Sequence, residues 1–419
     1  MIDKTTLENG IRVVTENIPA VHSVTVGVWI ESGSRHELKT QSGISHFVEH
    51  LLFKGTDRRS SRDIAREIDS VGGVLNAFTS REHCCFYAKV LAKKLPVALD
   101  LLADALQHSV FDLDEIEKER RVILQEISMI EDTPDDFIHD LFSQRFWEGH
   151  PLGLPILGTR DTVNNLHRND FLEHLKARFC GKNILICAAG DLDHSLFVDL
   201  VARAFGEVQA GERIPICVVP EYRPCVNFIH KDLEQVHVCL GTRALPQSHP
   251  NRFSAFLINT LLGGSMSSRL FQKIREDMGL AYSIYSYLNS HSDAGALVMY
   301  SAAAPEDAPE VVRLMLKELK RFKSELVSEE ELQSAKDQLK GNLLLSLEST
   351  DSRMTRLSKN EIYLGRQPTL KQVLNDFDKV TPESLQKLAE FIFQDDYLNL
   401  QLMGRIEEKH FPLIDLTLG

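Results

Sequence analysis

Two histidines and a glutamate stand close together in the stretch SHFVEHLLFKGT, residues 45–56, as His46, Glu49 and His50. A helix turns by about 100° per residue, so residues four apart lie on one face within a turn. Two imidazoles at that spacing can ligate one tetrahedral zinc ion, and a carboxylate between them can serve as a general base. An isolated H-x-x-E-H spacing is equally compatible with an amphipathic helix whose histidines have no chemical role.

A catalytic zinc site needs a third protein ligand, and the segment FDLDEIEKERRVILQEISMIEDT offers a candidate. Glu119 and Glu126 are seven residues apart and share one face of the predicted helix. Apolar neighbours such as Ile123 indicate partial burial, where an unpaired carboxylate is unfavourable. Glu126 as a ligand, supported by Glu119, explains both positions. The alternative is a solvated charged face with neighbouring arginines as counterions.

These residues must be positioned by elements that the hydrophobic pattern predicts. Runs that alternate or are rich in β-branched residues predict strands at 11–16, 23–30, 74–79, 85–91 and 183–190. Helical periodicity predicts helices at 43–53, 61–71, 94–107, 114–131 and 135–147. The elements predict an α+β fold with a largely antiparallel sheet packed with helices.

Two similar halves follow from the length and from an internal repeat. A Gly- and Pro-punctuated stretch near 206–224 has no helical period, so we expect an N-terminal domain at 1–210, a linker at 211–224 and a C-terminal domain at 225–419. HLLFKGT followed by SRDIAREIDSVGGVLNAFTS in the first half parallels TLLGGSM followed by SRLFQKIREDMGLAYSIYS in the second. The preserved order predicts two domains of one fold, related by duplication.

The second copy lacks the candidate ligands. Laying HLL over TLL sets Phe256, Asn259 and Thr260 opposite His46, Glu49 and His50, and Glu126 falls opposite Asn342 or a near neighbour. None of the four replacements is a typical zinc ligand. Their joint loss favours a functional role for the first-half residues over a chance arrangement on the helix surface.

Composition excludes several classes of protein. The chain has 419 residues, a formal net charge of −13, 43% hydrophobic and 26% charged residues. Acidic residues spread along the chain disfavour nucleic-acid binding, and no apolar run is long enough to span a bilayer. Seven cysteines without C-x-x-C spacing indicate a reducing compartment. With no signal-like N-terminus, we expect a cytoplasmic protein, or a mature organellar form, without membrane insertion.

The chain resembles the pitrilysin-type (inverzincin) zinc peptidases, and within them the group of the mitochondrial processing peptidase β-subunit and its bacterial homologues. The resemblance covers essentially the whole chain, through LENGIRVVTE, VGVWIESGSRHE, GISHFVEHLLFKGT, GGVLNAFTSREHCCFYAKV, ERRVILQEI and SSRLFQKIREDMGLAYSIYS. It implies that His46, His50 and Glu126 bind one zinc ion per chain, with Glu49 as the base. The separation of 76 residues from His50 to Glu126 (126 − 50) agrees with the family, and Glu119 matches an acidic residue that supports the site.

The resemblance also implies substrate-binding residues and an assembly. Asn76 and Ala77 match positions that hold a peptide substrate as an added β-strand. Arg275 and Tyr282, in IREDMGLAY, match a pair that contacts the substrate carbonyl and can stabilise an oxyanion. In a two-domain chain this pair is expected to reach the zinc of a partner subunit. A long glycine-rich loop marks the non-catalytic α-subunit of the processing peptidase, and this chain has no such loop. We therefore expect an active chain that forms a homodimer, with a heterodimer as the alternative.

The sequence thus predicts a zinc metalloendopeptidase that hydrolyses short or unfolded peptides inside a closed chamber. The alternative is a non-catalytic peptide-binding or scaffold subunit of the same fold. Such a subunit is expected to lack one or more ligands, whereas His46, Glu49, His50 and Glu126 are all present. A metallohydrolase acting on another substrate class is disfavoured by the whole-chain resemblance.

Overall fold

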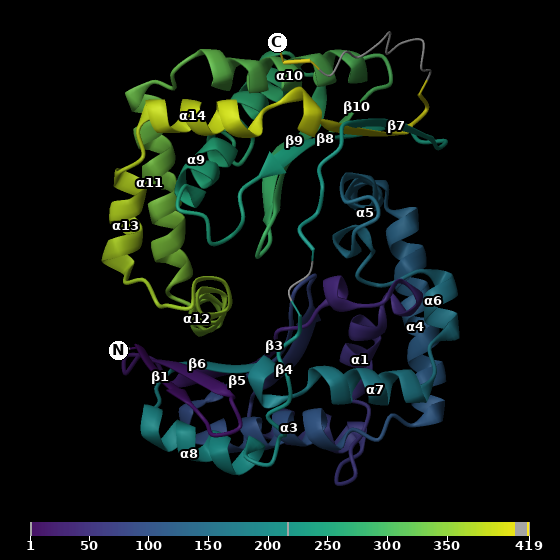
Figure 1. The fold of residues 1–419 in the computed structure, drawn as a ribbon, viewed down its shortest axis with the longest axis vertical. Coiled ribbons are helices and arrows are strands. Elements are labelled where there is room, and N and C mark those ends of the chain that lie inside the picture. Colours follow the sequence, from purple (N-terminus) through teal and green to yellow (C-terminus); the bar gives the residue numbers. More distant parts are fainter. Residues whose placement is uncertain (1, 216–217, 407–416, 419) are drawn as a thin grey trace. The chain divides into compact units, whose positions relative to one another are not determined.

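The structure is a computed structural model that describes residues 2–215, 218–406 and 417–418. Its elements divide between two compact units, and neither unit is one continuous piece of chain (Figure 1). The first unit comprises Met1–Met129, Leu154–Cys217 and Leu345–Gln367. The second comprises Ile130–Gly153, Val218–Leu344 and Pro368–Gly419.

The first unit contains a six-stranded sheet in the order β1-β2-β6-β3-β5-β4. All neighbours are antiparallel except β2 and β6, which are parallel. The strands are β1 (Ile2–Thr6), β2 (Arg12–Asn17), β3 (Ser23–Ile30), β4 (Val74–Thr79), β5 (Cys84–Leu91) and β6 (Ile184–Gly190). The predicted strands agree with these bounds to within a residue. Strand β1 was not predicted, because IDKTT lies at the sheet edge, only partly buried, and lacks an apolar run.

Helices cover both faces of this sheet. The helices of this unit are α1 (Ile44–Leu52), α2 (Ser61–Ser70), α3 (Leu95–His108), α4 (Leu113–Asp132), α6 (Arg160–Asn165), α7 (Arg168–Arg178), α8 (His194–Phe205) and α12 (Thr350–Leu364), and α1, α2, α3, α8 and α12 pack directly on the sheet. Val26 and Val28 of β3 pack into the larger apolar cluster, and Trp29 packs into a smaller one on the opposite face. Burial on both faces explains why SVTVGVWI reads as a nearly continuous apolar run.

The second unit contains a five-stranded sheet in the order β7-β11-β8-β10-β9, with only β11 and β7 parallel. Its strands are β7 (Cys225–His230), β8 (Val236–Ala244), β9 (Ala281–Ser290), β10 (Gly295–Ala303) and β11 (Asn399–Gly404). Its helices are α5 (Pro134–Phe146), α9 (Arg252–Leu262), the π-helix η6 (Phe271–Asp277), α10 (Ala308–Ser324), α11 (Glu329–Ser346), α13 (Leu370–Asp378) and α14 (Pro382–Ile392).

Short 3₁₀ helices complete the described elements. They are η1 (Ser34–His36), η2 (Lys39–Gln41), η3 (Ala92–Lys94), η4 (Pro151–Gly153), η5 (Gly181–Asn183) and η7 (Asp395–Tyr397). The described residues of the predicted linker, 211–215 and 218–224, form neither helix nor strand.

The two sheets have the same topology once β1 is set aside. If the strands of each sheet are numbered by their order in the chain, they lie side by side as first, last, second, fourth and third. In each sheet the first and last strands form the parallel pair. A shared order and a shared parallel pair are hard to reach independently. The predicted α+β class, with two similar domains of largely antiparallel sheet, is confirmed.

Each half of the chain contributes one helix to the other unit. The predicted contiguous domains at 1–210 and 225–419 therefore differ from the two units of the structure. Helix α5 follows α4 in the first half but packs on β8 and β11, whereas α12 follows α11 in the second half but packs on β2, β3 and β6 (Figure 1). The reason is an apolar second face on each sheet. Trp29 and Leu185 are covered by Met354 of α12, and Cys239 of β8 packs in one cluster with Phe142 of α5.

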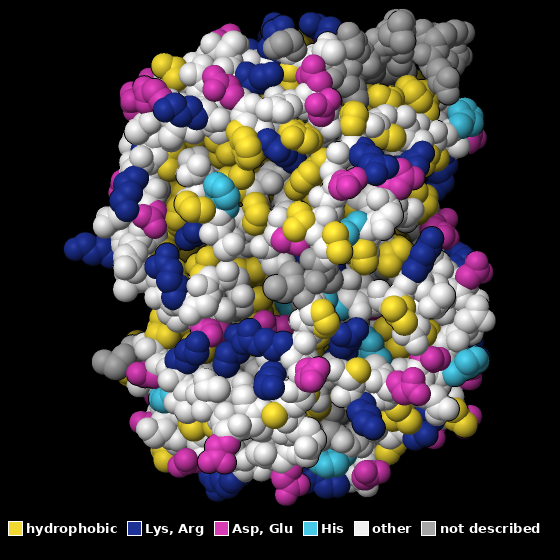
Figure 2. Space-filling view, viewed as in Figure 1, with side chains coloured by type: hydrophobic (Ala, Val, Ile, Leu, Met, Phe, Trp, Pro, Cys, Tyr) yellow, Lys and Arg dark blue, Asp and Glu magenta, His cyan; other side chains and the backbone are white. Residues whose placement is uncertain are grey.

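Other sequence expectations concern the surface, the cysteines and the membrane. Lys and Arg side chains are interspersed with Asp and Glu over the face shown in Figure 2. The six described cysteines are free, and Cys217 lies outside the described residues. Across 2–215, 218–406 and 417–418, no helix has both the length and the apolar character needed to cross a bilayer.

A glycine beneath each exchanged helix gives the first prediction. An added Cβ at Gly27 of β3 would lie 2.7 Å from Met354 Sδ, and one at Gly241 of β8 would meet the Phe142 ring. Gly27→Ala should therefore destabilise the protein by about 1–3 kcal/mol through overpacking, measured by denaturant unfolding. Gly341→Ala in α11 is the control, since nothing lies within 4 Å of a Cβ added there, and it should not destabilise the protein because alanine is favoured over glycine inside a helix. Wild-type stability of Gly27→Ala would refute close packing of α12.

Candidate metal centre and active site

Helix α1 carries His46, Glu49 and His50 on the side opposite its buried apolar stripe. Ile44, Phe47, Val48, Leu51 and Leu52 repeat at helical spacing and are buried. That stripe fixes the rotation of the helix about its axis. His46, Glu49 and His50 consequently lie together on the less buried side.

A buried carboxylate anchors the start of α1. Glu37 accepts hydrogen bonds from the backbone N–H groups of Gly43 and Ser45, both at 2.8 Å. Burial raises the pKa of Glu37 to about 7, and the two backbone bonds oppose that rise. The carboxylate also lies at the positive end of the helix dipole. Glu37 thereby fixes the first turn of α1, and one of the residues it binds, Ser45, immediately precedes His46.

Helix α4 supplies the group that orients His50. Glu119, which is buried, lies with Oε2 3.0 Å from His50 Nδ1, and its Oε1 pairs with Lys54 Nζ at 2.6 Å. A carboxylate in this place favours the tautomer with the proton on Nδ1 and leaves Nε2 as a lone-pair donor. His50 Nε2 lies 3.6 Å from Glu126 Oε2.

The three predicted ligands converge. His46 Nε2 lies 3.8 Å from Glu126 Oε2, and one donor atom from each of His46, His50 and Glu126 lies within 4.8 Å of the others. Ligands about 2.0–2.1 Å from a tetrahedral zinc ion are about 3.3 Å apart, so these separations fit the ion with small adjustments. In the part of the chain that the structure describes, this is the only such group of three or more His, Cys, Asp or Glu residues.

Protonation states match the same chemistry. Burial lowers the pKa of His46 to about 4, with a smaller contribution from His50, so the imidazole is neutral near pH 7, the form that binds metals. Burial raises the pKa of Glu49, while a hydrogen bond from Thr79 opposes the rise. A carboxylate with a raised pKa is a stronger base than a solvated one.

The predicted substrate-binding residues lie on an edge strand. In the described sheet β4 pairs only with β5, so its other edge carries no strand. Asn76 and Ala77 lie in the middle of β4, and Asn76 Oδ1 accepts the Ala77 N–H at 2.8 Å. An incoming peptide strand that uses this N–H has to displace the Asn76 amide.

Arg275 and Tyr282 lie together in the second unit, on η6 and β9. Arg275 Nη1 donates to the Tyr282 carbonyl at 2.9 Å, and its guanidinium lies 4.4 Å from the centroid of the Tyr282 ring. The Tyr282 residue is 78% exposed. The structure therefore pairs the two residues and leaves the phenol accessible.

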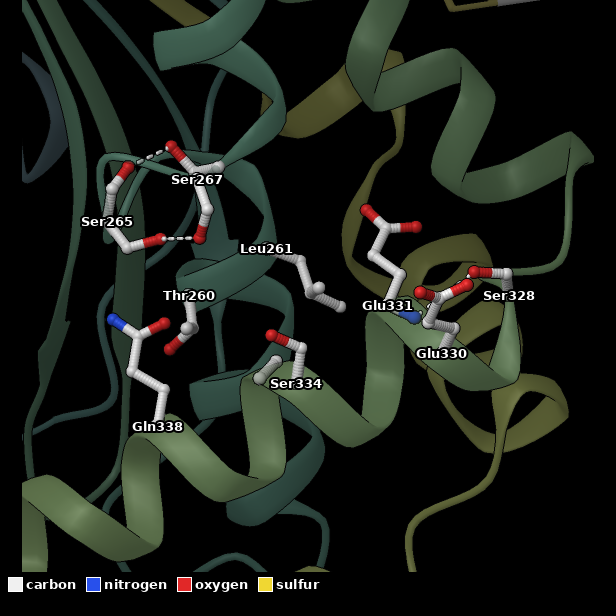
Figure 3. A pocket seen from close by; sticks show the side chains of 11 residues that line it. Thr260, Leu261, Ser265, Ser267, Ser328, Glu330, Glu331, Ser334 and Gln338 are labelled. Atoms are coloured by element: carbon white, nitrogen blue, oxygen red, sulfur yellow. Dashed lines mark hydrogen bonds between the residues drawn. The ribbon is translucent and has the colours of Figure 1, made fainter.

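The second copy has a pocket where the first has the candidate ligands. A pocket of about 350 Å³ lies between α9, the 265–268 turn and α11 (Figure 3). Thr260, opposite His50, lines it, as does Ser334, which falls opposite Glu119 when 114–121 is laid over 329–336. The lining is rich in hydroxyl groups, has two carboxylates and no imidazole: Thr260, Leu261, Ser265, Ser267, Ser268, Ser328, Glu330, Glu331, Ser334, Ala335 and Gln338.

Three residues that shape the site were not predicted from the sequence: Glu37, Lys54 and Thr79. Glu37 precedes α1 by a loop, and an acid just ahead of a helix was the available signal. Lys54 and Thr79 contact Glu119 and Glu49 across 65 and 30 residues of chain. No local pattern reports contacts at such separations.

Comparison with known proteins identifies the family of the chain. The family profile described as Insulinase (Peptidase family M16) matches residues 12–160, and that of the Peptidase M16 inactive domain matches 165–339. The uncharacterized zinc protease YmxG of Bacillus subtilis is 42% identical, covering 95% of this chain and 97% of its own length. An uncharacterized zinc protease of Mycobacterium tuberculosis is 40% identical, covering 94% of this chain and 91% of its own length.

Solved structures share the fold at lower identity. The chain is similar to a protease from Helicobacter pylori, with a TM-score of 0.89 and 22% identity, covering 96% of this chain and 99% of that one. It is also similar to a peptidase M16 inactive domain from Pseudomonas fluorescens, with a TM-score of 0.91 and 17% identity over 97% and 98% of the two chains. The resemblance to pitrilysin-type peptidases is confirmed: this chain belongs to peptidase family M16.

Proposed function

We propose that this chain is a zinc-dependent endopeptidase that hydrolyses short or unfolded peptides inside a closed chamber. The observation that supports it is the convergence of His46, His50 and Glu126 within 4.8 Å, beside the carboxylate of Glu49 on the same helix. Relatives at about 40% identity over nearly the whole chain bear the name zinc protease. One zinc ion per chain suits the single group of ligands among the described residues.

Each side chain then has a task. When bound, zinc supplies a Lewis acid that lowers the pKa of water and polarises the scissile carbonyl. His46, His50 and Glu126 would hold the ion, and Glu119 keeps His50 in the required tautomer. Glu49 accepts the proton of the attacking water on a carboxylate oxygen and delivers it to the leaving amine.

Substrate binding by an added strand would select for extended chains. The unpaired edge of β4, with Asn76 and Ala77, offers main-chain hydrogen bonds that do not depend on the substrate side chains. A folded protein cannot present such a strand, so we infer a preference for short or unfolded peptides. The net charge of −13 favours basic peptides over nucleic acid.

We further propose that Arg275 and Tyr282 act on the site of a partner subunit in a homodimer. A guanidinium and an accessible phenol side by side can stabilise an oxyanion. A heterodimer with a related chain is the alternative assembly.

A scaffold role is the competing function, and one solved structure of the same fold motivates it. A chain of the Complex III2 from Candida albicans matches with a TM-score of 0.83 and 23% identity over 98% of this chain and 97% of that one. A scaffold does not need a metal site, so zinc content separates the two functions.

Replacing the proposed base gives the central prediction. Glu49→Gln removes the proton acceptor and leaves the three ligands, so hydrolysis of an unfolded peptide should fall by about 10²–10⁴-fold with zinc content unchanged by elemental analysis. A chelator should abolish wild-type activity, and added zinc should restore it. Glu67→Gln on α2, whose carboxylate pairs with Arg59, is the control and should behave as wild type. Zinc-free wild-type protein would favour the scaffold.

Removing the carboxylate behind His50 should loosen the metal. Glu119→Gln replaces the acceptor of the His50 Nδ1 proton with an amide, and zinc affinity should fall about 10–100-fold, measured by competition with a chromophoric chelator. Glu117→Gln on the same helix is the control, because the Glu117 side chain is 65% exposed. Equal affinities for the two variants would contradict the role of Glu119.

Mixed dimers test whether the site is shared between subunits. Arg275→Ala alone should lose about 10²-fold in activity, and Glu49→Gln is inactive for its own reason. Mixing the unfolded chains and refolding them together should restore roughly a quarter of wild-type activity, because half of the dimers then hold one complete site. Activity no higher than the sum of the two variants would mean that the pair does not act on a partner.

A further inference from the structure

Thr79, which has no role in the proposed catalysis so far, lies against the Glu49 carboxylate. Its Oγ1 donates a hydrogen bond to Glu49 Oε2 at 2.5 Å. Among the described residues this is the only side-chain hydrogen bond to Glu49. A carboxylate with one short, charge-assisted hydrogen bond is restricted in its rotation.

The Thr79 hydroxyl is itself held in place. Cys84, the cross-strand neighbour of Thr79, has its Sγ 3.6 Å from Thr79 Oγ1. Burial raises the pKa of Cys84 to about 12, so the thiol keeps its proton. Because the hydroxyl proton goes to Glu49, the thiol is the donor in this contact, and the chain runs from Cys84 through Thr79 to Glu49.

The backbone around Thr79 is also fixed. The turn after β4 is closed by bonds from Ser80 N and Ser80 Oγ to His83 O, at 2.9 and 2.7 Å. The Ser34 N–H donates to Ser80 O at 3.1 Å, and the Arg35 N–H donates to Arg81 O at 2.8 Å. Thr79 is therefore a fixed point, and not a mobile loop residue that happens to touch Glu49.

Thr79 ends the strand whose free edge would receive the substrate. It follows Ala77 by two residues, so their side chains lie on the same face of β4. Helix α1 packs on this strand. The hydroxyl thus links the base on α1 to the strand against which the scissile bond would be aligned.

We propose, resting on the peptidase function above, that Thr79 is a positioning residue: its hydroxyl holds the Glu49 carboxylate in the orientation from which it takes the proton of the attacking water. The hydrogen bond fixes the position of the Glu49 carboxylate relative to strand β4. Substrate binding at Asn76 and Ala77 does not involve the hydroxyl. Loss of the hydroxyl should therefore affect the chemical step and leave peptide binding unchanged.

The test compares Thr79→Val, which keeps the shape and loses the hydroxyl, with Thr79→Ser, which keeps the hydroxyl. We expect kcat of Thr79→Val to fall about 100-fold, with KM within about twofold of wild type and zinc content unchanged. Thr79→Ser should recover most of the activity. Thr15→Val on β2, which also removes a buried strand hydroxyl, is the control for general destabilisation and should keep wild-type kcat.

A crystal structure of Thr79→Val gives a readout that does not need activity. We expect the Glu49 side chain to leave the position seen beside residue 79. An unmoved Glu49, wild-type kcat in Thr79→Val, or a Thr79→Ser variant as impaired as Thr79→Val would each overturn the inference. If the wild-type protein hydrolyses no peptide, the proposed function fails, and the position of Glu49 in the variant still decides whether Thr79 holds it.

Discussion

The approach of Glu126 to the two imidazoles of α1 depends on the packing of α4 against the first unit. Ile123 and Ile127 of α4 are buried in the same apolar cluster as Phe47, Val48 and Leu51 of α1. Burial of each such side chain contributes about 1.5–3 kcal/mol, so the core determines the position of α4. The packing gathers Glu49, Glu119 and Glu126 around two histidines, with Lys54 as a cation on Glu119. A divalent cation among the ligands would relieve the repulsion between these carboxylates.

Around this centre, polar contacts do what apolar packing cannot. Apolar contacts fix the positions of helices, but they leave the rotation of a carboxylate or the tautomer of an imidazole undetermined. Glu37 fixes the first turn of α1, Glu119 selects the tautomer of His50, and Thr79 restrains Glu49. Each of these residues is itself bonded to backbone or to a second side chain.

The helix exchange makes the two halves interdependent. The face of the first sheet that includes Trp29 and Leu185 is covered only when α12 packs on it, and α12 begins more than 300 residues after Trp29 in the chain. The N-terminal half cannot complete its own core while the rest of the chain is absent. Duplication thus produced two sheets of one topology but not two independent domains. In the second copy the helices corresponding to α1 and α4 enclose a hydroxyl-lined pocket instead of a set of candidate metal ligands.

The sequence by itself determined strands β2–β6, helices α1–α5, the repeat that relates the two halves, and the candidate ligands. Periodicity and β-branched runs are local properties, and the spacing of His46, Glu49 and His50 on one helix face follows from helix geometry alone. Glu126 could be named from its place on a half-buried helix and from family spacing, but its distance from the imidazoles could not. Only the tertiary structure decided the exchange of α5 and α12 and the bonds of Glu37 and Thr79. It also decided how Arg275 contacts the carbonyl and the ring of Tyr282. Those contacts depend on three-dimensional packing between segments distant in the chain or on the exact direction of a side chain, and neither leaves a periodic signal in the sequence.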